Sequence, residues 1–296
     1  MKAGITKGII LAGGEGSRLY PLTNIVCKQL LPVYNKPMVY YPLSTLMQLG
    51  LRDILLISTP KDLASFKNLL GNGNRLGLTI SYAIQEHPEG IAQAFIIGKE
   101  FIGRDNVTLI LGDNIFYGVD SIAKHALKYK DGAMIFGYQM KSPQRYGVIG
   151  FNESGNPDSI EEKPIRPKSN YAVTGLYLYD NNVVSIAESL KPSQRGELEI
   201  TDINNYYLSK KKLCAVKLES GIGWLDTGTF DSLIEAGNYI ATIEKRQGII
   251  VGSIEEAAYK MGFIDSSQLK KITEQLPDND YRQYLCDLIG AANDCR

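Results

Sequence analysis

The sequence predicts an α/β fold, in which a mostly parallel sheet is flanked by helices. The first observation is that short, nearly uninterrupted apolar segments recur and have the composition of buried strands, at residues 8–12, 53–58, 78–84 and 107–111. The second is that segments with helical patterns separate them, at residues 37–50, 60–70 and 90–101. Strands that alternate with helices are typical of a parallel sheet covered on both faces, and such a sheet binds ligands at the carboxyl ends of its strands.

The middle of the chain has a different pattern. We expect strands at residues 133–140, 147–151 and 171–179, with a turn over 153–156. These hairpins would be grafted on the α/β core, and we place the pocket of a second substrate there. Further elements are expected as a helix, a strand, a loop and a helix, at residues 197–210, 213–218, 224–228 and 230–245. Beyond Gly248 the pattern is helical, and residues 281–289 form its last amphipathic segment.

No low-complexity linker and no internal repeat divides the chain. We therefore interpret residues 1–240 as one core, with a part for the first substrate over roughly residues 1–130 and the inserted hairpins over roughly 131–228. Residues 241–296 are interpreted as a helical C-terminal extension.

The charge balance bears on possible partners. The chain has 32 basic and 32 acidic residues among 296, with no basic block, which argues against a nucleic-acid polymer or an anionic membrane surface as the main partner. No apolar run approaches the ~20 residues that span a bilayer, and the N-terminus lacks the pattern of a secretory leader. We therefore expect a cytoplasmic protein without a membrane partner.

A glycine-rich turn follows the first predicted strand. In the segment KGIILAGGEGSR, the residues Gly13, Gly14 and Gly16 let the backbone curl so that successive N–H groups converge on an anion. A dinucleotide fingerprint would need a third glycine three residues after Gly16, and a Walker loop would need a lysine where Ser17 precedes Arg18. A phosphate cradle of another kind is favoured, although the same glycines would also suit an ordinary tight turn.

Two carboxylates follow predicted strands or loops. Asp113 comes directly after a buried strand, and Asp226 lies in the segment WLDTG. Each alone fits a turn or a helix cap, but two carboxylates at one sheet edge suit Mg²⁺, which takes one or two carboxylates together with water and phosphate oxygens. Lys28 and Lys163 lie in loops beside prolines, where a lysine is usually a solvated surface charge. In a site that binds phosphate, both lysines could contact phosphate oxygens.

The chain offers no clear nucleophile with a histidine base, because it has only two histidines. Phosphoryl and nucleotidyl transfer proceed by in-line displacement and need cations, backbone N–H groups and a metal more than a nucleophile. The inventory of residues therefore favours that class of reaction.

Together these segments resemble the sugar nucleotidyltransferase superfamily, and within it the glucose-1-phosphate thymidylyltransferases, or dTDP-glucose pyrophosphorylases. The resemblance rests on ordered blocks that include GIILAGGEGSRLYP, KQLLPVYNKPMVYYPLSTLM, LGDNIFYG, RYGVIGF, EEKPIRPKSNYAVTGLYLYD, RGELEITDIN and WLDTGT. It implies a Rossmann-like nucleotide-binding core with an inserted sugar-binding part. It also implies transfer from dTTP to glucose 1-phosphate, giving dTDP-glucose and pyrophosphate with Mg²⁺, as the first step of dTDP-L-rhamnose or related dTDP-deoxysugar biosynthesis, in a homotetramer.

The resemblance also implies roles for individual residues. Nucleotide binding is implied for Leu11, Gly13, Gly14, Gly16, Ser17, Arg18, Lys28, Gln29, Gln85, Gly90 and Asp113. Sugar-phosphate binding is implied for Tyr146, Gly147, Glu162, Lys163 and Val173. The implied metal ligands are Asp113 and Asp226, and the implied catalytic residues are Arg18, Lys28 and Lys163. Ser17 stands where many members have threonine, and either hydroxyl can donate to a phosphate.

Two alternatives stay open from the sequence. A UTP- or CTP-using sugar-1-phosphate nucleotidyltransferase on the same scaffold would differ only in how the base and sugar are recognised. A non-catalytic sugar-nucleotide sensor would be expected to lack a metal ligand or the arginine, whereas Arg18, Asp113 and Asp226 are all present.

Overall fold

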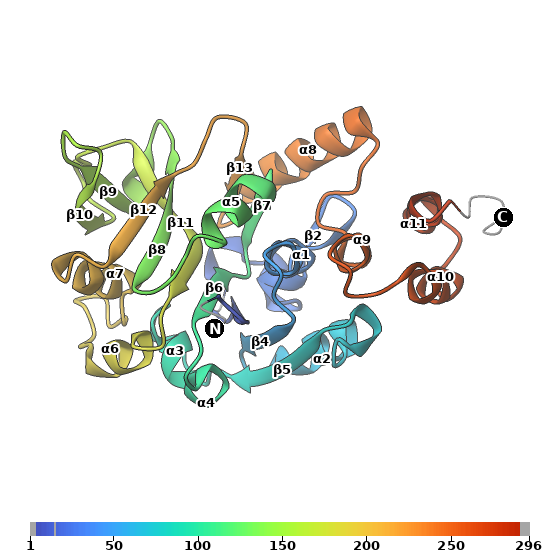
Figure 1. Ribbon diagram of the computed structural model, residues 1–296, viewed down its shortest axis with the longest axis horizontal. Coiled ribbons are helices and arrows are strands. Elements are labelled where there is room, and N and C mark those ends of the chain that lie inside the picture. Colours follow the sequence, from blue (N-terminus) through green and yellow to red (C-terminus); the bar gives the residue numbers. More distant parts are fainter. Residues whose placement is uncertain (1–3, 15, 291–296) are drawn as a thin grey trace.

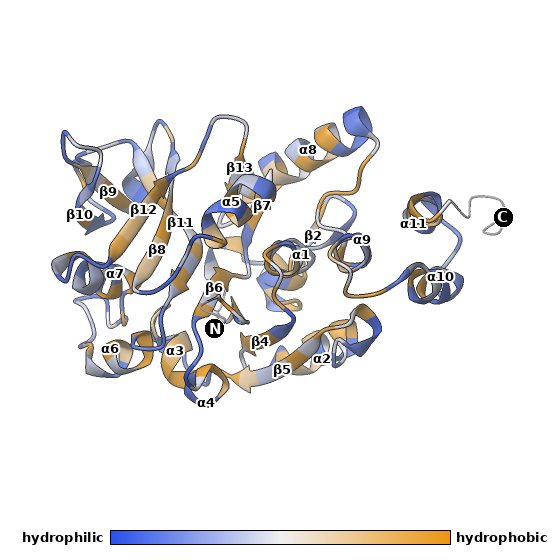
Figure 2. Cartoon of the chain, viewed as in Figure 1, coloured by the Kyte–Doolittle hydropathy of each residue, from blue (hydrophilic) through white to orange (hydrophobic). Residues whose placement is uncertain are grey.

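The computed structural model describes residues 4–14 and 16–290 and is built around a nine-stranded sheet (Figure 1). Its strands run in the order β10-β9-β11-β6-β1-β4-β5, and β8 and β12 extend it from β11. The predicted α/β fold is confirmed. In Figure 2 the strands of this sheet are largely hydrophobic, whereas α8 and α10 carry both hydrophobic and hydrophilic residues.

The N-terminal half of the sheet is parallel. It consists of β1 (Lys7–Ala12), β4 (Asp53–Ser58), β5 (Thr79–Ile84) and β6 (Val107–Leu111). Alternate residues of β1 enter two different cores, since Ile10 packs on one face of the sheet and Ile9 on the other. The first core is covered by α1 (Tyr40–Gln48) and α2 (Leu63–Leu70), and the second by α3 (Gln93–Ile97) and α4 (Lys99–Ile102). Burial on both faces explains why these strands are almost wholly apolar.

The other half of the sheet is largely antiparallel. The long strand β11 (Tyr171–Tyr179) pairs antiparallel with β6 and links the two halves. Around it lie β8 (Ala133–Gln139), β9 (Gly147–Phe151), β10 (Pro157–Glu162) and β12 (Leu213–Lys217), with helices α6 (Val183–Ser189) and α7 (Ile200–Ser209). The predicted turn at 153–156 does connect a hairpin, between β9 and β10.

A small second sheet contains Asp226 and begins directly after Asp113. It pairs β7 (Asn114–Tyr117) antiparallel with β13 (Gly223–Asp226), in a register that sets Asn114 opposite Asp226. Asp113 therefore lies at the junction of β6 and β7, and Asp226 ends β13. Nearby are the short hairpin of β2 (Pro32–Val33) and β3 (Lys36–Pro37), α5 (Val119–Ala126), and α8 (Phe230–Gln247).

The C-terminal part is helical, as expected, with α9 (Ile254–Lys260), α10 (Ser266–Glu274) and α11 (Asp280–Leu288). Helix α9 packs against α1, and Arg75 forms an ion pair of 2.8 Å with the buried Glu255 of α9. Figure 1 shows α10 and α11 at one end of the molecule, beyond α9. The expected end of the core at residue 240 lies inside α8, and the division of the chain remains a prediction.

Several elements differ from the sequence-based expectations. The helix expected over residues 90–101 is two short helices separated by Gly98, and the loop expected at residues 224–228 begins with the strand β13. We missed β2, β3, β7, α5, β10 and α6, and five short 3₁₀ helices at Ser17–Leu19, Leu22–Asn24, Lys28–Leu30, Asn74–Leu76 and Pro143–Arg145. The chain turns from β6 into β7 within two residues, and β7 has only four residues, which is too short for a clear strand pattern. Pro42 does not break α1, because it is the third residue of that helix, where its missing N–H needs no intrahelical partner.

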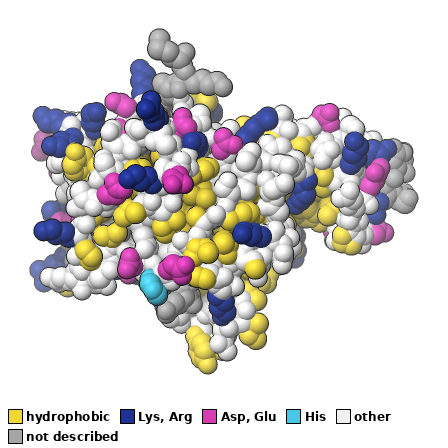
Figure 3. All heavy atoms as spheres, turned by 90° about the horizontal axis from the view of Figure 1, so that it is seen from below, with side chains coloured by type: hydrophobic (Ala, Val, Ile, Leu, Met, Phe, Trp, Pro, Cys, Tyr) yellow, Lys and Arg dark blue, Asp and Glu magenta, His cyan; other side chains and the backbone are white. Residues whose placement is uncertain are grey.

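The surface agrees with the balanced charge. Figure 3 shows side chains of both signs interspersed over one face, with hydrophobic side chains between them. Across the part of the chain that the structure describes, no helix is both long and apolar enough to span a membrane.

Candidate functional site

Two adjoining cavities open at the carboxyl ends of β1 and β6. The larger has a volume of about 330 Å³ and the smaller about 200 Å³. They share four wall residues, namely Gly13, Arg18, Gln29 and Asp113. The position at this sheet edge is where a parallel sheet is expected to bind ligands.

The smaller cavity is built on the glycine turn. Gly14 and Gly16 have φ angles of 100° and 61°, in the left-handed region that side chains disfavour. At Gly13 the restriction is one of space, because a Cβ atom there would lie 2.0 Å from Oε1 of Gln85. The other residues that line this cavity include most of the expected phosphate residues, namely Ser17, Arg18, Lys28, Gln29 and Asp113.

Lys28 and Asp113 form an ion pair in the wall of this cavity. The ammonium of Lys28 donates to Oδ2 of Asp113, and the Lys28 side chain is only 8% exposed. Nδ2 of Asn114 donates to the other carboxylate oxygen, Oδ1, at 2.9 Å. Burial alone would raise the pKa of the Asp113 carboxyl, but the charge of Lys28 and these hydrogen bonds outweigh it and lower that pKa. Asp113 is therefore held as a carboxylate.

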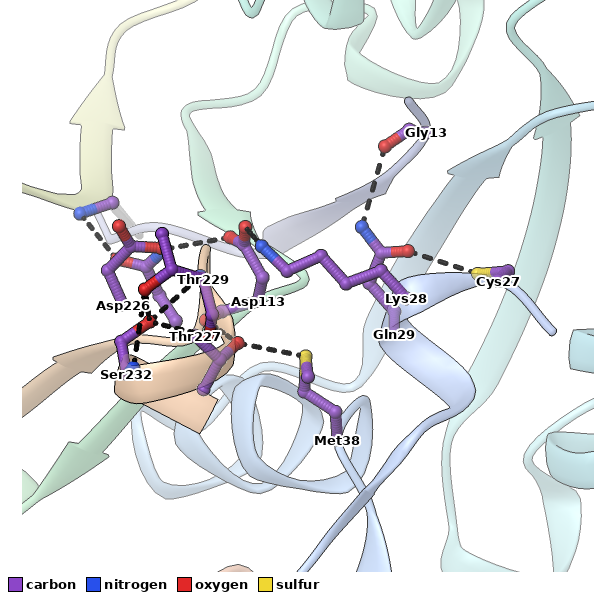
Figure 4. Close-up of polar contacts among 12 residues, drawn as sticks. Gly13, Cys27, Lys28, Gln29, Met38, Asp113, Asp226, Thr227, Thr229 and Ser232 are labelled. Carbon is purple, nitrogen blue, oxygen red and sulfur yellow. Dashed lines mark hydrogen bonds and ion pairs between the residues drawn. The ribbon is translucent and has the colours of Figure 1, made fainter. Parts of the chain in front are cut away.

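Asp226 lies on the opposite side of Asp113 from Lys28 (Figure 4). Burial, and then the charge of Asp113, raise the pKa of Asp226 above its usual range. The hydroxyl of Tyr146 donates to Oδ2 of Asp226 at 3.2 Å. Burial and the nearby Asp226 raise the pKa of Tyr146 to about 12, so this hydroxyl stays protonated at neutral pH.

The two aspartates form a half-buried, mutually repelling pair, which suits a divalent cation. Among the described residues, no group of three or more His, Cys, Asp and Glu side chains could hold a metal. A cation at this place would therefore have two protein carboxylates and would complete its shell with water and phosphate oxygens, as Mg²⁺ does in phosphate-transferring sites. The donor set fits that ion and does not resemble a closed zinc site.

The backbone after β13 fixes the geometry between the aspartates. The backbone N–H and the hydroxyl of Thr227 both donate to the carbonyl oxygen of Asp113, at 3.3 and 2.9 Å. Figure 4 shows Thr227 between the strand end and Met38, whose sulfur it also contacts at 3.1 Å. A Cβ atom at Gly228 would lie 3.1 Å from Asp226 and 3.3 Å from the guanidinium of Arg18. This glycine therefore leaves room for Arg18 to approach the aspartates.

The larger cavity continues from the aspartates to the antiparallel half of the sheet. Its walls include the expected sugar-side residues Tyr146, Gly147, Glu162, Lys163 and Val173. A Cβ atom at Gly147 would meet the side chains of Thr201, Val173 and Glu162 at 3.3 to 3.5 Å, so the glycine keeps the space between them open.

Glu162 is well placed to accept hydrogen bonds in this cavity. Its Oε2 already accepts from the hydroxyl of Thr201 at 2.5 Å, and its Oε1 lies 3.7 Å from the ammonium of Lys163 and 3.4 Å from Arg195. Lys163 has a φ angle of 44°, an unusual conformation for a residue other than glycine, of the kind that occurs at binding sites.

Two of the expected residues do not line these cavities. Gln85 is 2% exposed and lies behind the glycine turn, where its amide donates to Oε1 of Gln93 at 2.6 Å. Gly90, with a φ angle of 108°, packs against the backbone of Leu198. The remaining expected residues come together from several elements. These are β1 and the glycine turn after it, the 3₁₀ helices at Ser17–Leu19 and Lys28–Leu30, the junction of β6 and β7, and the strands β9, β10, β11 and β13 with the residues beside them.

The structure adds residues that the sequence analysis did not select. The larger cavity is also lined by Ile91, Leu111, Asn114, Arg145, Gly175, Tyr177, Ile200 and Trp224. Asn114 directly follows Asp113 in the block LGDN, and Trp224 lies two residues before Asp226, so closeness to a candidate ligand was a usable signal. A separate hollow of about 390 Å³ lies between β7, α5 and α9, away from both aspartates and the glycine turn.

Comparisons with known proteins agree with this geometry. The nucleotidyl transferase family matches the chain over residues 7–243. The glucose-1-phosphate thymidylyltransferase of Neisseria meningitidis is 54% identical over 285 residues, covering 96% of this chain and 99% of that protein. The enzyme of the same name from Mycolicibacterium smegmatis is 53% identical, with the same coverage.

Two solved structures are also similar to this chain. A putative glucose-1-phosphate thymidylyltransferase from Bacillus anthracis, in complex with sucrose, has a TM-score of 0.74 and 42% identity, over 79% of this chain and 94% of that chain. A UDP-glucose pyrophosphorylase complexed with UDP-glucose has a TM-score of 0.72 at 24% identity, over 82% of this chain and all of that chain, and is similar in fold.

Proposed function

This chain belongs to the nucleotidyl transferase family, and we propose that it transfers the thymidylyl group of dTTP to glucose 1-phosphate, giving dTDP-glucose and pyrophosphate. Support for the thymidine nucleotide comes from relatives of that name that are about half identical over nearly the whole chain. The single structural observation that carries the proposal is the meeting of Asp113, Asp226, Lys28 and Arg18 where the two cavities adjoin.

The proposed chemistry is a direct displacement. A phosphate oxygen of glucose 1-phosphate attacks the α-phosphorus of dTTP, the new oxygen–phosphorus bond forms, and the bond from the α-phosphorus to the oxygen bridging the β-phosphate breaks. Pyrophosphate leaves with that oxygen. Such a reaction depends mainly on positioning and on stabilising charge spread over the non-bridging oxygens.

We assign the triphosphate to the smaller cavity, where the glycine turn supplies backbone N–H groups and Arg18 and Lys28 supply positive charge. Glucose 1-phosphate is assigned to the larger cavity, with its phosphate near Lys163 and its hydroxyls near Glu162 and Gly147. We assign recognition of the thymine base to Gln85 and Gly90. Since Gln85 is 2% exposed, this role requires the glycine turn to move when nucleotide binds.

Asp113 and Asp226 are the residues that would hold a divalent cation, which we propose to be Mg²⁺. When bound, it would supply positive charge for the phosphate oxygens. The protein itself positions the two substrates, and the protonated hydroxyl of Tyr146 donates a hydrogen bond to Asp226. A homotetramer, a cytoplasmic location and a place at the first step of dTDP-L-rhamnose or related biosynthesis are further proposals that rest on the family resemblance.

One assay tests the function. Pyrophosphate release is measured with dTTP, UTP, CTP, ATP and GTP, each offered with several sugar 1-phosphates and with or without Mg²⁺. The proposal expects the highest kcat/KM for dTTP with glucose 1-phosphate and no release without a divalent cation. Preference for UTP or CTP would replace it with the corresponding nucleotidyltransferase, and binding without any release would favour a sensor.

A further inference from the structure

Asn114 joins the candidate cation site to two other strands. The residue is the first of β7, is 3% exposed, and directly follows Asp113. Its Oδ1 accepts hydrogen bonds from the backbone N–H of Gly175 at 3.0 Å and from the indole N–H of Trp224 at 2.6 Å. Its Nδ2 donates to Oδ1 of Asp113 at 2.9 Å. One side chain thus links β7 with β11 and β13.

The orientation of this amide follows from its partners. A backbone N–H and an indole N–H can only donate, so the carbonyl oxygen of Asn114 must face them. The NH₂ group then necessarily faces Asp113, whose carboxylate can only accept. Both lone pairs of the amide oxygen accept hydrogen bonds, and a flip of the amide would break all three bonds.

The backbone of β11 is adapted to this side chain. The pairing of β11 with β8 is interrupted between Val173 and Tyr177, and Gly175 lies within that interruption. A Cβ atom at Gly175 would lie 2.5 Å from Oδ1 of Asn114. A glycine is therefore required for the backbone N–H of residue 175 to reach the amide.

Asn114 also adjoins the second aspartate. It lies directly opposite Asp226 in the ladder between β7 and β13. The ring of Trp224 packs edge-on against Tyr146, with centroids 5.0 Å apart, and the Tyr146 hydroxyl donates to Asp226. Asn114 is thus the peptide neighbour of one carboxylate and the cross-strand neighbour of the other.

We propose that Asn114 is a positioning residue for the cation site. It holds Oδ1 of Asp113 and leaves Oδ2, the oxygen paired with Lys28, as the one that exchanges its partner when a cation binds. Its hydrogen bonds to Gly175 and Trp224 also fix the position of the Asp113 carboxylate relative to the wall of the larger cavity. This inference rests on the proposed function, because it assigns a cation to Asp113 and Asp226. Partners of metal ligands commonly change metal affinity by 10- to 100-fold when removed.

The test compares Asn114→Ala with wild type, using Mn²⁺ as the probe. The first readout is the thermal unfolding midpoint as a function of MnCl₂ concentration without nucleotide, which reports binding by linkage. The second is the Mn²⁺ concentration that gives half-maximal pyrophosphate release. We expect the Mn²⁺ dissociation constant from the first readout and the half-maximal Mn²⁺ concentration from the second to rise about 10-fold or more. The KM for glucose 1-phosphate should change less.

A matched control separates positioning from stability. Asn204 is also fully buried, accepts a hydrogen bond from the Tyr179 hydroxyl at 2.5 Å and lines neither cavity. Asn204→Ala should lower the unfolding midpoint without moving either Mn²⁺ constant. Trp224→Phe removes one hydrogen-bond donor to Asn114 without removing a contact to Asp113. If the orientation of the Asn114 amide controls that of Asp113, both Mn²⁺ constants should rise by about threefold.

The proposal is overturned if Asn114→Ala keeps both Mn²⁺ constants within about twofold of wild type while its unfolding midpoint falls as it does in Asn204→Ala. That result would make Asn114 a purely structural link. Failure of the proposed function has a different signature, because wild type would then release no pyrophosphate from dTTP and glucose 1-phosphate, whatever the variants do to Mn²⁺ binding.

Discussion

The ammonium of Lys28 forms an ion pair with the same carboxylate of Asp113 that would bind a cation. The pair is largely buried, with side chains 8% and 21% exposed, so neither charge can rely on water. Asp226 lies near the same carboxylate and is disfavoured as an anion by burial and by Asp113. In this arrangement Lys28 lies against the acidic pair, and we expect a bound cation to displace the lysine from Asp113. The released ammonium is then available to a phosphate.

The first prediction follows from this competition. Lys28→Met should bind Mn²⁺ more tightly than wild type in the absence of nucleotide, by about 3- to 10-fold, because the competing charge is gone. Turnover should nevertheless fall by at least about 100-fold, because the phosphate loses a cation. Calorimetric titration with MnCl₂ and steady-state rates provide the two measurements.

The control for Lys28 is an exposed ion pair elsewhere. Lys99 and Glu188 lie 2.7 Å apart with side chains 60% and 40% exposed, so Lys99→Met should change neither quantity. Weaker Mn²⁺ binding in Lys28→Met would mean that the lysine supports the cation site rather than competing with it.

Much of this arrangement could be predicted from the sequence. The parallel strands were found because burial on both faces leaves a continuous apolar signal, and Asp113 follows the last of them. β13 was missed because it has four residues and pairs with β7 only, so its strand character comes from a partner more than 100 residues earlier. The link from Asn114 to Gly175 joins residues 61 positions apart and needs a glycine at 175, which no periodicity in the sequence reveals.

The second prediction separates the two aspartates by their effects on stability. Asp113→Asn leaves Lys28 buried without its partner and should destabilise the fold by about 3 kcal/mol. Asp226→Asn removes a carboxylate whose ionised form burial and Asp113 disfavour, and should be neutral or stabilising at pH 7. Urea unfolding of the cation-free variants gives both values, and a large loss of stability in Asp226→Asn would contradict the assigned electrostatics.

Both aspartate variants should lose about three orders of magnitude in turnover at saturating Mg²⁺, because each removes one of only two protein ligands. Far-UV circular dichroism serves as the check that each variant is folded. A wild-type rate in Asp226→Asn at saturating Mg²⁺ would eliminate the two-carboxylate site.

The third prediction concerns the division of work between two cations. Lys163 lines only the larger cavity, whereas Arg18 lines both and approaches Asp226 near Gly228. Lys163→Ala should raise the KM for glucose 1-phosphate by about 10-fold or more and leave dTTP binding nearly unchanged. Arg18→Ala should weaken dTTP binding and slow pyrophosphate exchange. Equal effects of the two variants on dTTP binding without sugar would show that the roles are assigned wrongly.

The last prediction concerns the kinetic route. The two cavities adjoin at Asp113 and can hold both substrates at once, and the mechanism requires no side-chain nucleophile. Initial-velocity patterns should therefore intersect, as expected when both substrates are bound before chemistry. With dTTP carrying a single sulfur on its α-phosphorus, one displacement inverts that centre, whereas two displacements through a nucleotidylated protein retain it. We expect inversion, determined by phosphorus NMR of the dTDP-glucose analogue. Retention, or a nucleotidylated protein trapped without glucose 1-phosphate, would rule out direct attack and would require a nucleophile among the residues that line the cavities.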